Sequence, residues 1–242
     1  MRNIIIRVFS IGTAIAQLAG IGLQAATIPY QLDNGMVKYP INAADGTETH
    51  DTWFANEFTA QANANSIVSV MYFLSSASPS YPADIVIYKQ TSAQTAPLGF
   101  TRIYTQPFTP LAGMPVGNTV QSLSLTTPVQ LEVGDKFLVA IFMRDVVALP
   151  PNDKYPWTLD TSGDATGTFW DRSAPDSFNL DDLSGARPIN QNLADGNWNP
   201  GAGHVMIRAF GTAVPEPSVL TLCGLAAAGA VFATRRRCSN RE

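Results

Sequence analysis

Short apolar runs, each closed by Gly, Pro, Asn or Asp, are the feature that most restricts how this 242-residue chain can fold. Between Trp53 and Gly211 no window of 12 or more residues carries an apolar stripe with helical spacing. Many short strands with turn residues between them are typical of β-sandwiches and barrels. The sequence therefore predicts an all-β fold, an antiparallel sandwich of jelly-roll or lectin-like type. Its expected strands are 53–60, 66–75, 83–90, 99–105, 120–127, 136–143, 157–160, 167–170 and 203–211.

Several of these runs alternate between apolar and polar residues, which places every second side chain on one face of a strand. The residues expected to face the core are Ile85 and Ile87, Leu123 and Leu125, and Val205 and Ile207. Arg208 falls on the opposite face of its strand. The stretch 152–200 is different, because it is rich in Asp, Asn, Ser, Gly and Pro and is expected to form long polar loops.

The first 26 residues have the order of a secretory signal peptide. Arg2 and Arg7 precede a short apolar run, and small residues follow up to Ala26. Signal peptidase is expected to cut after Ala25 or Ala26. The alternative is a buried N-terminal helix, but the apolar run is too short to span a bilayer in the mature protein.

Residues 213–242 combine three parts in a fixed order. The motif 214–218 precedes an apolar segment, 219–234, and a basic tail, 235–242. As a helix, the run 219–233 would be about 22 Å long, close to the thickness of a bilayer's hydrocarbon core. Positive charge after it would keep that end in the cytoplasm. A plain C-terminal membrane anchor would have the same features.

The tail resembles the PEP-CTERM sorting signal of Gram-negative bacteria. The residues that carry the resemblance are Pro215, Glu216 and Pro217, followed by the apolar helix and by Arg235, Arg236 and Arg237. The resemblance implies transient anchoring in the inner membrane and processing by an exosortase. It also implies a final location at the cell surface or in the extracellular matrix, often in bacteria that make extracellular polysaccharide.

Removal of both signals leaves one domain, residues 27–212, of a size that can bury a substantial core. Residues 27–217 hold nine Lys and Arg against eighteen Asp and Glu, a net charge of −9. Such a surface repels nucleic acid and anionic lipid. Cys223 and Cys238 both lie in the tail, so the domain is expected to have no disulfide and no thiol chemistry.

The domain also resembles the lectin-like β-sandwich that follows papain-like peptidase domains in some secreted bacterial proteases. The phrases that carry this resemblance are 55–60, 68–73, 85–88, 125–131, 134–140, Trp198 and 205–210. The same phrases are similar to anchored β-sandwich families with other C-terminal sorting tails. No peptidase domain is attached here. The resemblance implies a binding or adhesion module whose ligand is open.

Catalytic patterns are sparse, and the chain is expected not to be an enzyme. His50 is predicted in a polar loop and His204 at the start of the last strand, and no Gly-x-Ser-x-Gly motif occurs. A glycosidase would need two carboxylates in a cleft, and Glu48, Glu57 and Glu132 are the domain's glutamates. Two alternatives stay open: a secreted hydrolase acting on polysaccharide, and a purely structural matrix protein.

Tryptophans give one candidate binding site, because aromatic faces stack on sugar rings. Trp157, Trp170 and Trp198 lie in or beside the polar loops, and Asn197 and Asn199 flank the last of them. We expect a shallow carbohydrate platform at one end of the sandwich, which would allow a partnership with extracellular polysaccharide. The alternative is that these rings cap the hydrophobic core.

Aspartates give a second candidate, a calcium site in the same region. Calcium binds six to eight oxygens, and loops rich in Asp, Asn and Gly can supply them. The candidate ligands are Asp160, Asp164, Asp171, Asp176, Asp181 and Asp182. No Asp-x-Asp-x-Asp-Gly loop is present, and solvated turn residues are the alternative. No other cofactor is expected.

Overall fold

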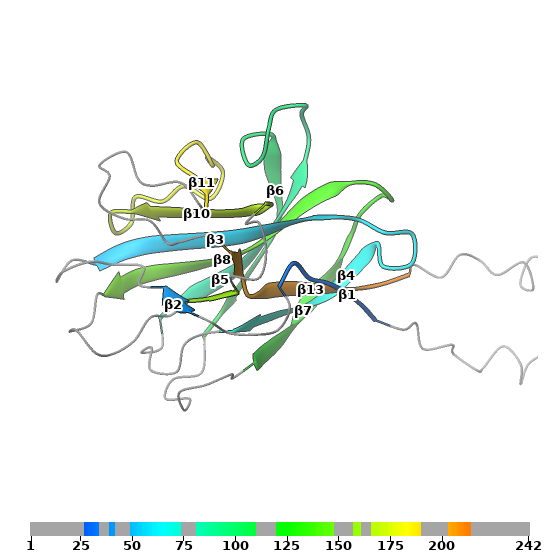
Figure 1. Ribbon diagram of the computed structural model, residues 1–242, viewed down its shortest axis with the longest axis horizontal. Coiled ribbons are helices and arrows are strands. Elements are labelled where there is room, and N and C mark those ends of the chain that lie inside the picture. The colour runs from blue at the N-terminus through cyan, green and yellow to red at the C-terminus, as the bar shows by residue number, and fades with distance from the viewer. Residues whose placement is uncertain are drawn as a thin grey trace, which may run out of the picture. The chain divides into compact units, whose positions relative to one another are not determined.

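The structure is a computed structural model that describes residues 27–33, 39–41, 49–73, 81–109, 120–147, 157–160, 166–189 and 203–213. All regular elements in these ranges are strands (Figure 1). They are β1 (Ile28–Tyr30), β2 (Tyr39–Ile41), β3 (Thr49–Thr59), β4 (Ser66–Phe73), β5 (Ala83–Gln90), β6 (Phe100–Phe108), β7 (Val120–Gln130), β8 (Lys136–Val147), β9 (Trp157–Asp160), β10 (Thr168–Ser173), β11 (Arg187–Pro188), β12 (His204–Val205) and β13 (Ile207–Thr212).

The strands form three antiparallel sheets, which makes the domain an all-β sandwich. One sheet has the order β1-β13-β4-β7, and a second has the order β11-β10-β3-β8-β5-β6. A small third sheet has the order β12-β9-β2. The predicted fold class is confirmed at this level, and the predicted strand at 83–90 has the bounds that the structure gives β5.

The predicted signal segment (1–26) and the predicted sorting segment (214–242) lie outside the described residues. Within the ranges that the structure describes, no helix is long and apolar enough to cross a membrane.

Most of the core lies between the four-stranded and six-stranded sheets. Phe54, Ile141 and Phe137 from the six-stranded sheet pack in one cluster with Ile67 and Val70 from the four-stranded sheet. Each of these side chains is less than 2% exposed. Burial of such residues stabilises the fold by about 1.5–3 kcal/mol per side chain, which makes this layer the main source of stability.

The central strands of the six-stranded sheet are buried on both faces, unlike those of the four-stranded sheet. The outer face carries a second apolar cluster that includes Trp53, Val86 and Leu138, and residues 178–186 cover part of it. Strands buried on both sides are expected to be continuously apolar rather than alternating. This accounts for the unbroken run from Phe137 to Met143 in β8.

The alternation predicted for other strands is confirmed. In β5, Ile85 and Ile87 both face the inner cluster. In β7, Leu123 and Leu125 pack in the inner cluster, whereas the alternate residues Ser122 and Ser124 are exposed. In the last strands, Val205 and Ile207 are fully buried, and Arg208 is partly exposed.

Side chains of β6 close one open side of the sandwich. The Gln106 amide donates to the carbonyl of Ser124 (3.2 Å) and accepts from the N–H of Thr126 (2.8 Å). The Tyr104 hydroxyl lies 2.9 Å from the Thr126 hydroxyl. These bonds occupy backbone groups of β7 that would otherwise be an exposed strand edge, which lowers the risk of edge-to-edge association.

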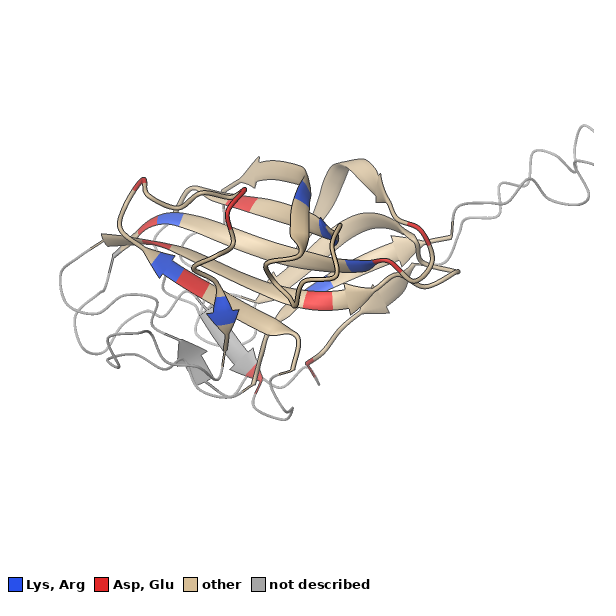
Figure 2. Cartoon of the chain, turned by 90° about the horizontal axis from the view of Figure 1, so that it is seen from above, with Lys and Arg blue, Asp and Glu red and all other residues tan. Residues whose placement is uncertain are grey.

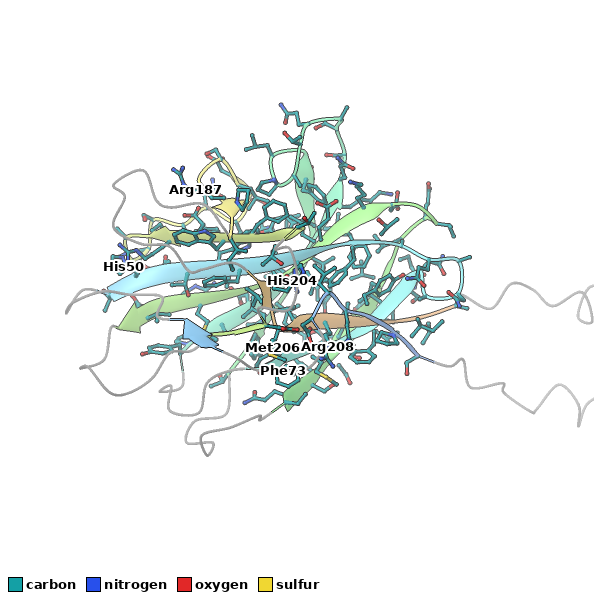
Figure 3. The ribbon with its side chains drawn as sticks, in the orientation of Figure 1. His50, Phe73, Arg187, His204, Met206 and Arg208 are labelled. Atoms are coloured by element: carbon teal, nitrogen blue, oxygen red, sulfur yellow. The ribbon has the colours of Figure 1, made fainter. Side chains whose placement is uncertain are left out.

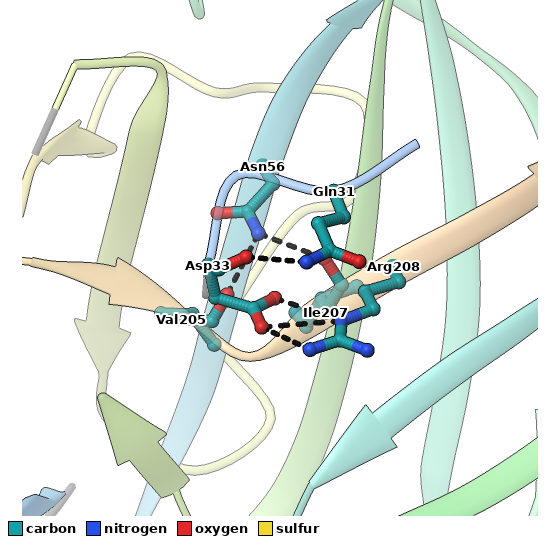
Figure 4. A network of polar contacts seen from close by, with 6 residues as sticks. All are labelled: Gln31, Asp33, Asn56, Val205, Ile207 and Arg208. Carbon is teal, nitrogen blue, oxygen red and sulfur yellow. Dashed lines mark hydrogen bonds and ion pairs between the residues drawn. The ribbon is translucent and has the colours of Figure 1, made fainter. Parts of the chain in front are cut away.

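Polar side chains fasten the first and last strands to the sandwich (Figure 4). The Asn56 amide donates to the carbonyls of Val205 (2.7 Å) and Ile207 (2.9 Å), where the chain passes from β12 to β13. Arg208 forms a bidentate ion pair with Asp33, which lies shortly after the end of β1. Segments distant in sequence are therefore locked together at one corner of the fold.

Candidate binding site on the outer face

The structure describes only two of the three tryptophans of the predicted carbohydrate site. Trp170 lies in β10 with its side chain fully buried in the inner core, which is the position expected if the ring caps the core rather than stacking on a ligand. Trp170 pairs with Phe54 of β3, and the first half of β10, from Thr168 to Trp170, is buried. Trp157 lies in β9, while Trp198, Asn197 and Asn199 lie outside the described residues.

The predicted calcium ligands are dispersed. Asp160 is buried in β9, Asp171 lies in β10, and Asp176, Asp181 and Asp182 lie in the segment after β10. Asp164 lies outside the described residues, as do the sorting residues Pro215, Glu216, Pro217, Arg235, Arg236 and Arg237. In the described part of the chain, no three Asp, Glu, His or Cys side chains come together as a metal-binding group. The structure thus does not assemble the five described aspartates into one site.

The two histidines are far apart (Figure 3). His50 lies in β3 rather than in the predicted polar loop. His204 begins β12, as predicted, but it is only 5% exposed. Its Nδ1 lies 2.9 Å from the Thr168 hydroxyl, which in turn donates to Asn56 Oδ1 (2.8 Å). This buried network joins β3, β10 and β12, and such networks serve to fix a unique arrangement of strands.

The outer face of the six-stranded sheet carries a different site, which the segment after β10 creates. We call residues 174–186 the strap. Its backbone forms local turns, with N–H to carbonyl bonds from Ser177 to Ala174, Asp182 to Asn179 and Ala186 to Leu183. Its links to the sheet are side-chain contacts and a hydrogen bond from the Phe178 N–H to Asp51. Beyond the strap, the N–H of Ile189 donates to the carbonyl of Thr168 (3.0 Å).

Aromatic packing holds the strap against the sheet. Phe178 stacks on Trp53, with ring centroids 6.3 Å apart and ring planes 21° apart, and its centroid lies 5.0 Å from that of Phe142. Leu183 is 5% exposed and packs in the same cluster. An added Cβ at Gly185 would lie 2.5 Å from a carboxylate oxygen of Asp171, so a larger residue there would require the Asp171 side chain to shift.

A pocket of about 260 Å³ lies between the strap and the sheet. Its walls combine ionic, amide and apolar side chains. They are Asp51, Arg102, Phe142, Arg144, Asp176, Phe178, Asn179, Leu180 and Asp181. Concave sites lined by aromatic side chains with a few converging polar groups are the usual form of small-ligand sites.

Two arginines approach the pocket from the sheet. Arg102 on β6 pairs with Asp181 of the strap at 2.8 Å, and Arg144 on β8 pairs with Asp84 on β5. The Arg144 guanidinium also lies over the Phe142 ring, 4.9 Å from its centroid. Figure 2 shows how positive and negative residues lie beside one another on the strands. The pocket therefore offers both donors and acceptors, with no excess of positive charge.

Asp51 is the most buried carboxylate of the pocket, at 2% exposure. A register shift between His50 and Thr52 in the β3–β8 pairing places it at an irregularity, where a strand can redirect a side chain. Burial raises the pKa of the Asp51 carboxyl. The backbone N–H groups of Asp145 and Phe178 counteract part of this rise in pKa. Asp145 donates to Asp51 Oδ1 at 3.2 Å.

Arg144 also borders a second hollow, of about 330 Å³. The other residues that line it are Pro82, Ala83, Pro107, Phe108 and Thr109. Arg144 thus borders both hollows, while Ala83 and Phe108 of the second one pack with the inner cluster.

Nothing in the sequence singled out Trp53, Tyr88, Arg102 or Arg144. They come from four different strands, so no local spacing links them. The one available signal was the composition of 152–200, which led to Asp176 and Asp181 as calcium ligands and not to the ion pair that Asp181 forms with Arg102.

Comparison with known proteins gives no relative: no protein family, curated protein or solved structure matches this chain. The fold and the site alone define its class, an all-β sandwich with a polar and aromatic pocket on the outer face of its larger sheet.

Proposed function

We propose that this chain is an exported, non-catalytic binding protein whose lectin-like sandwich binds a saccharide in the outer-face pocket. The composition of the pocket is the observation that carries the proposal. Charged and amide side chains there can form paired hydrogen bonds with vicinal hydroxyls, and Phe142 supplies apolar surface for ring carbons. The mixture of Arg and Asp favours a neutral sugar over a polyanion.

The location of the protein is part of the same proposal. A PEP-CTERM tail would deliver the domain to the envelope, where extracellular polysaccharide is the abundant ligand of this chemistry. Changing Pro215 and Glu216 together to Ala is expected to abolish exosortase processing. The unprocessed protein should then accumulate in the membrane fraction, as measured by fractionation and blotting. Equal processing of both forms would remove the sorting hypothesis.

A glycan array probed with the full-length protein, with and without calcium, tests the binding function. Wild-type protein is expected to bind at least one neutral glycan, and Arg102→Ala should weaken that binding about tenfold, because a charged group gives the stronger hydrogen bonds. Calcium dependence would revive the aspartate site of the loop region.

Lys89→Ala is the matched control. Lys89 is as exposed as Arg102 (31% against 33%) and also forms an ion pair, with Asp135, but it lies outside the pocket. Equal effects of the two substitutions, or no binding by wild-type protein, would contradict a saccharide site in the pocket.

One observation favours the rival function, a polysaccharide hydrolase. Asp51 combines burial, a raised pKa and a place in the pocket, which are properties of a general acid. Release of reducing ends from a bound glycan, and its loss in Asp51→Asn, would establish that function. Binding without release would leave the non-catalytic one.

A further inference from the structure

Two buried polar atoms beneath the strap have no hydrogen-bond partner. They are Nε1 of Trp53 and the hydroxyl of Tyr88, and both side chains are fully buried. The rings meet edge to face, with centroids 6.1 Å apart. Burial raises the pKa of the Tyr88 hydroxyl, and the nearby Trp53 indole lowers it in part. The two groups do not reach hydrogen-bond geometry. Buried polar groups are nearly always satisfied, so an exception calls for an explanation.

These two atoms lie beside the charged pair that joins the strap to the sheet. Arg102 lies opposite Tyr88 in the β5–β6 pairing and forms the ion pair with Asp181 of the strap. The Arg102 charge lowers the pKa of the Tyr88 hydroxyl, and the Asp181 charge raises it. Their side chains are 33% and 61% exposed, so the ion pair is a weak fastening. The sheet beneath the strap thus holds one stacking surface and two hydrogen-bonding atoms without a partner, and a partly exposed ion pair joins the strap to the sheet beside them.

Phe178 occupies the stacking surface in this structure. Its ring lies nearly parallel to that of Trp53, as a pyranose ring lies on a tryptophan in a sugar site. The backbone–backbone hydrogen bonds of the strap are local turns, so side-chain packing, the Arg102–Asp181 ion pair and the bond from the Phe178 N–H to Asp51 are the contacts that opening must break.

We propose that the Trp53 face is a sugar-stacking subsite, which Phe178 fills in the closed protein and which a neutral saccharide takes when the strap lifts. In the open form, Trp53 Nε1 donates to a sugar oxygen and the Tyr88 hydroxyl bonds a sugar hydroxyl. Arg102, released from Asp181, bonds vicinal hydroxyls. This inference rests on the proposed saccharide function and adds to it the subsite, the competing side chain and the moving segment.

Opening is measured first without ligand. Acrylamide quenching of Trp53 fluorescence, taken as the difference between wild-type protein and Trp53→Phe, reports access to the ring. Phe178→Ala is expected to raise this quenching several-fold, and Asp181→Ala to raise it less. Unchanged quenching in both variants would show that the strap does not cover Trp53 through these contacts.

Binding is measured next, by calorimetry with the tightest glycan found on the array. Tyr88→Phe should weaken binding about threefold to tenfold, the effect of one net hydrogen bond. It should not destabilise the fold, because the hydroxyl it removes has no partner. Phe178→Ala should tighten binding about tenfold, because the sugar no longer displaces a stacked ring. General loss of structure would weaken binding and cannot mimic that gain.

Tyr30→Phe is the control for Tyr88→Phe. The Tyr30 hydroxyl bonds the carbonyl of Ala64 (3.1 Å) and the N–H of Gln61 (2.9 Å) in the inner core. Its removal should lower stability and leave affinity unchanged. If wild-type protein binds a glycan and Arg102→Ala weakens it, but Tyr88→Phe and Phe178→Ala do not alter affinity, the strap inference is wrong and the pocket proposal stands. If no glycan binds, both fall.

Discussion

The ion pair between Asp33 and Arg208 is nearly removed from water, and its disruption should be costly. Asp33 is inaccessible and the Arg208 side chain is 15% exposed. Arg208 Nε lies 3.1 Å from each carboxylate oxygen, and Nη2 makes a further contact with Oδ1. The guanidinium also lies 5.3 Å from the centroid of the Phe73 ring. Three kinds of contact therefore depend on one arginine.

Asp33→Ala leaves the Arg208 charge buried without its carboxylate. A broken buried pair costs about 3–5 kcal/mol, most of it the desolvation of the remaining charge. For a domain of this size, 1 kcal/mol lowers the melting temperature by about 2–4 °C, so a fall on the order of 10 °C is expected. Urea unfolding followed by circular dichroism gives the free energy directly.

The double substitution Asp33→Leu with Arg208→Met separates the charge effect from packing. Apolar replacement of both members of a buried pair is often neutral or stabilising, so the double variant should recover most of the loss. A single-variant loss below about 1 kcal/mol, or a double variant as unstable as the sum of the single losses, would refute the assignment of a strongly coupled buried pair.

Three further changes test other parts of the fold. Gly211→Ala should destabilise the domain by more than about 3 kcal/mol in thermal melts, because the new Cβ would lie 1.9 Å from the Ala64 carbonyl oxygen; a normal melting curve would contradict it. Asn56→Ala removes the donors of two carbonyls on either side of Met206 and should cost about 2–4 kcal/mol, with faster amide exchange in β13. Burial raises the pKa of the Asp171 carboxyl above 3.8. The folded protein therefore binds a proton at Asp171 more readily than the unfolded chain does. The stability linked to this proton is present below pH about 4 and is lost as the pH rises through the pKa of the folded state. Asp171→Asn should therefore flatten the fall in melting temperature between pH 4 and 7, and an unchanged slope would count against the burial effect.

Strands with strong alternation or continuous apolar runs were predictable, and three of the four shortest strands were not. β1, β2 and β11 contain Pro29, Pro40 and Pro188, and each lies at the edge of its sheet. A proline cannot donate to a neighbouring strand, so it is tolerated at an edge. Because proline is also a turn signal, a segment of two or three residues that contains one cannot be told from a loop without its partner strand.

The site depended on tertiary contacts that no local pattern records. Composition predicted that the stretch after β10 was polar, which holds for most of the strap. It did not predict that Phe178 and Leu183 would turn inward and cover a sheet face. Trp170 illustrates the same limit, since a strand buried on both faces gives no sequence signal for which face a ring takes.

Burial of the six-stranded sheet on both faces links the stability of the domain to its proposed activity. An outer face that carries Trp53, Val86 and Leu138 would expose a large apolar surface if it were left open, and such surfaces promote association. The strap covers part of this surface. In the proposed mechanism, the Trp53 ring becomes available for stacking when the strap lifts. Any substitution that tightens the strap should therefore raise stability and lower affinity together. A variant that raised both would show that the strap and the ligand do not compete for the Trp53 ring.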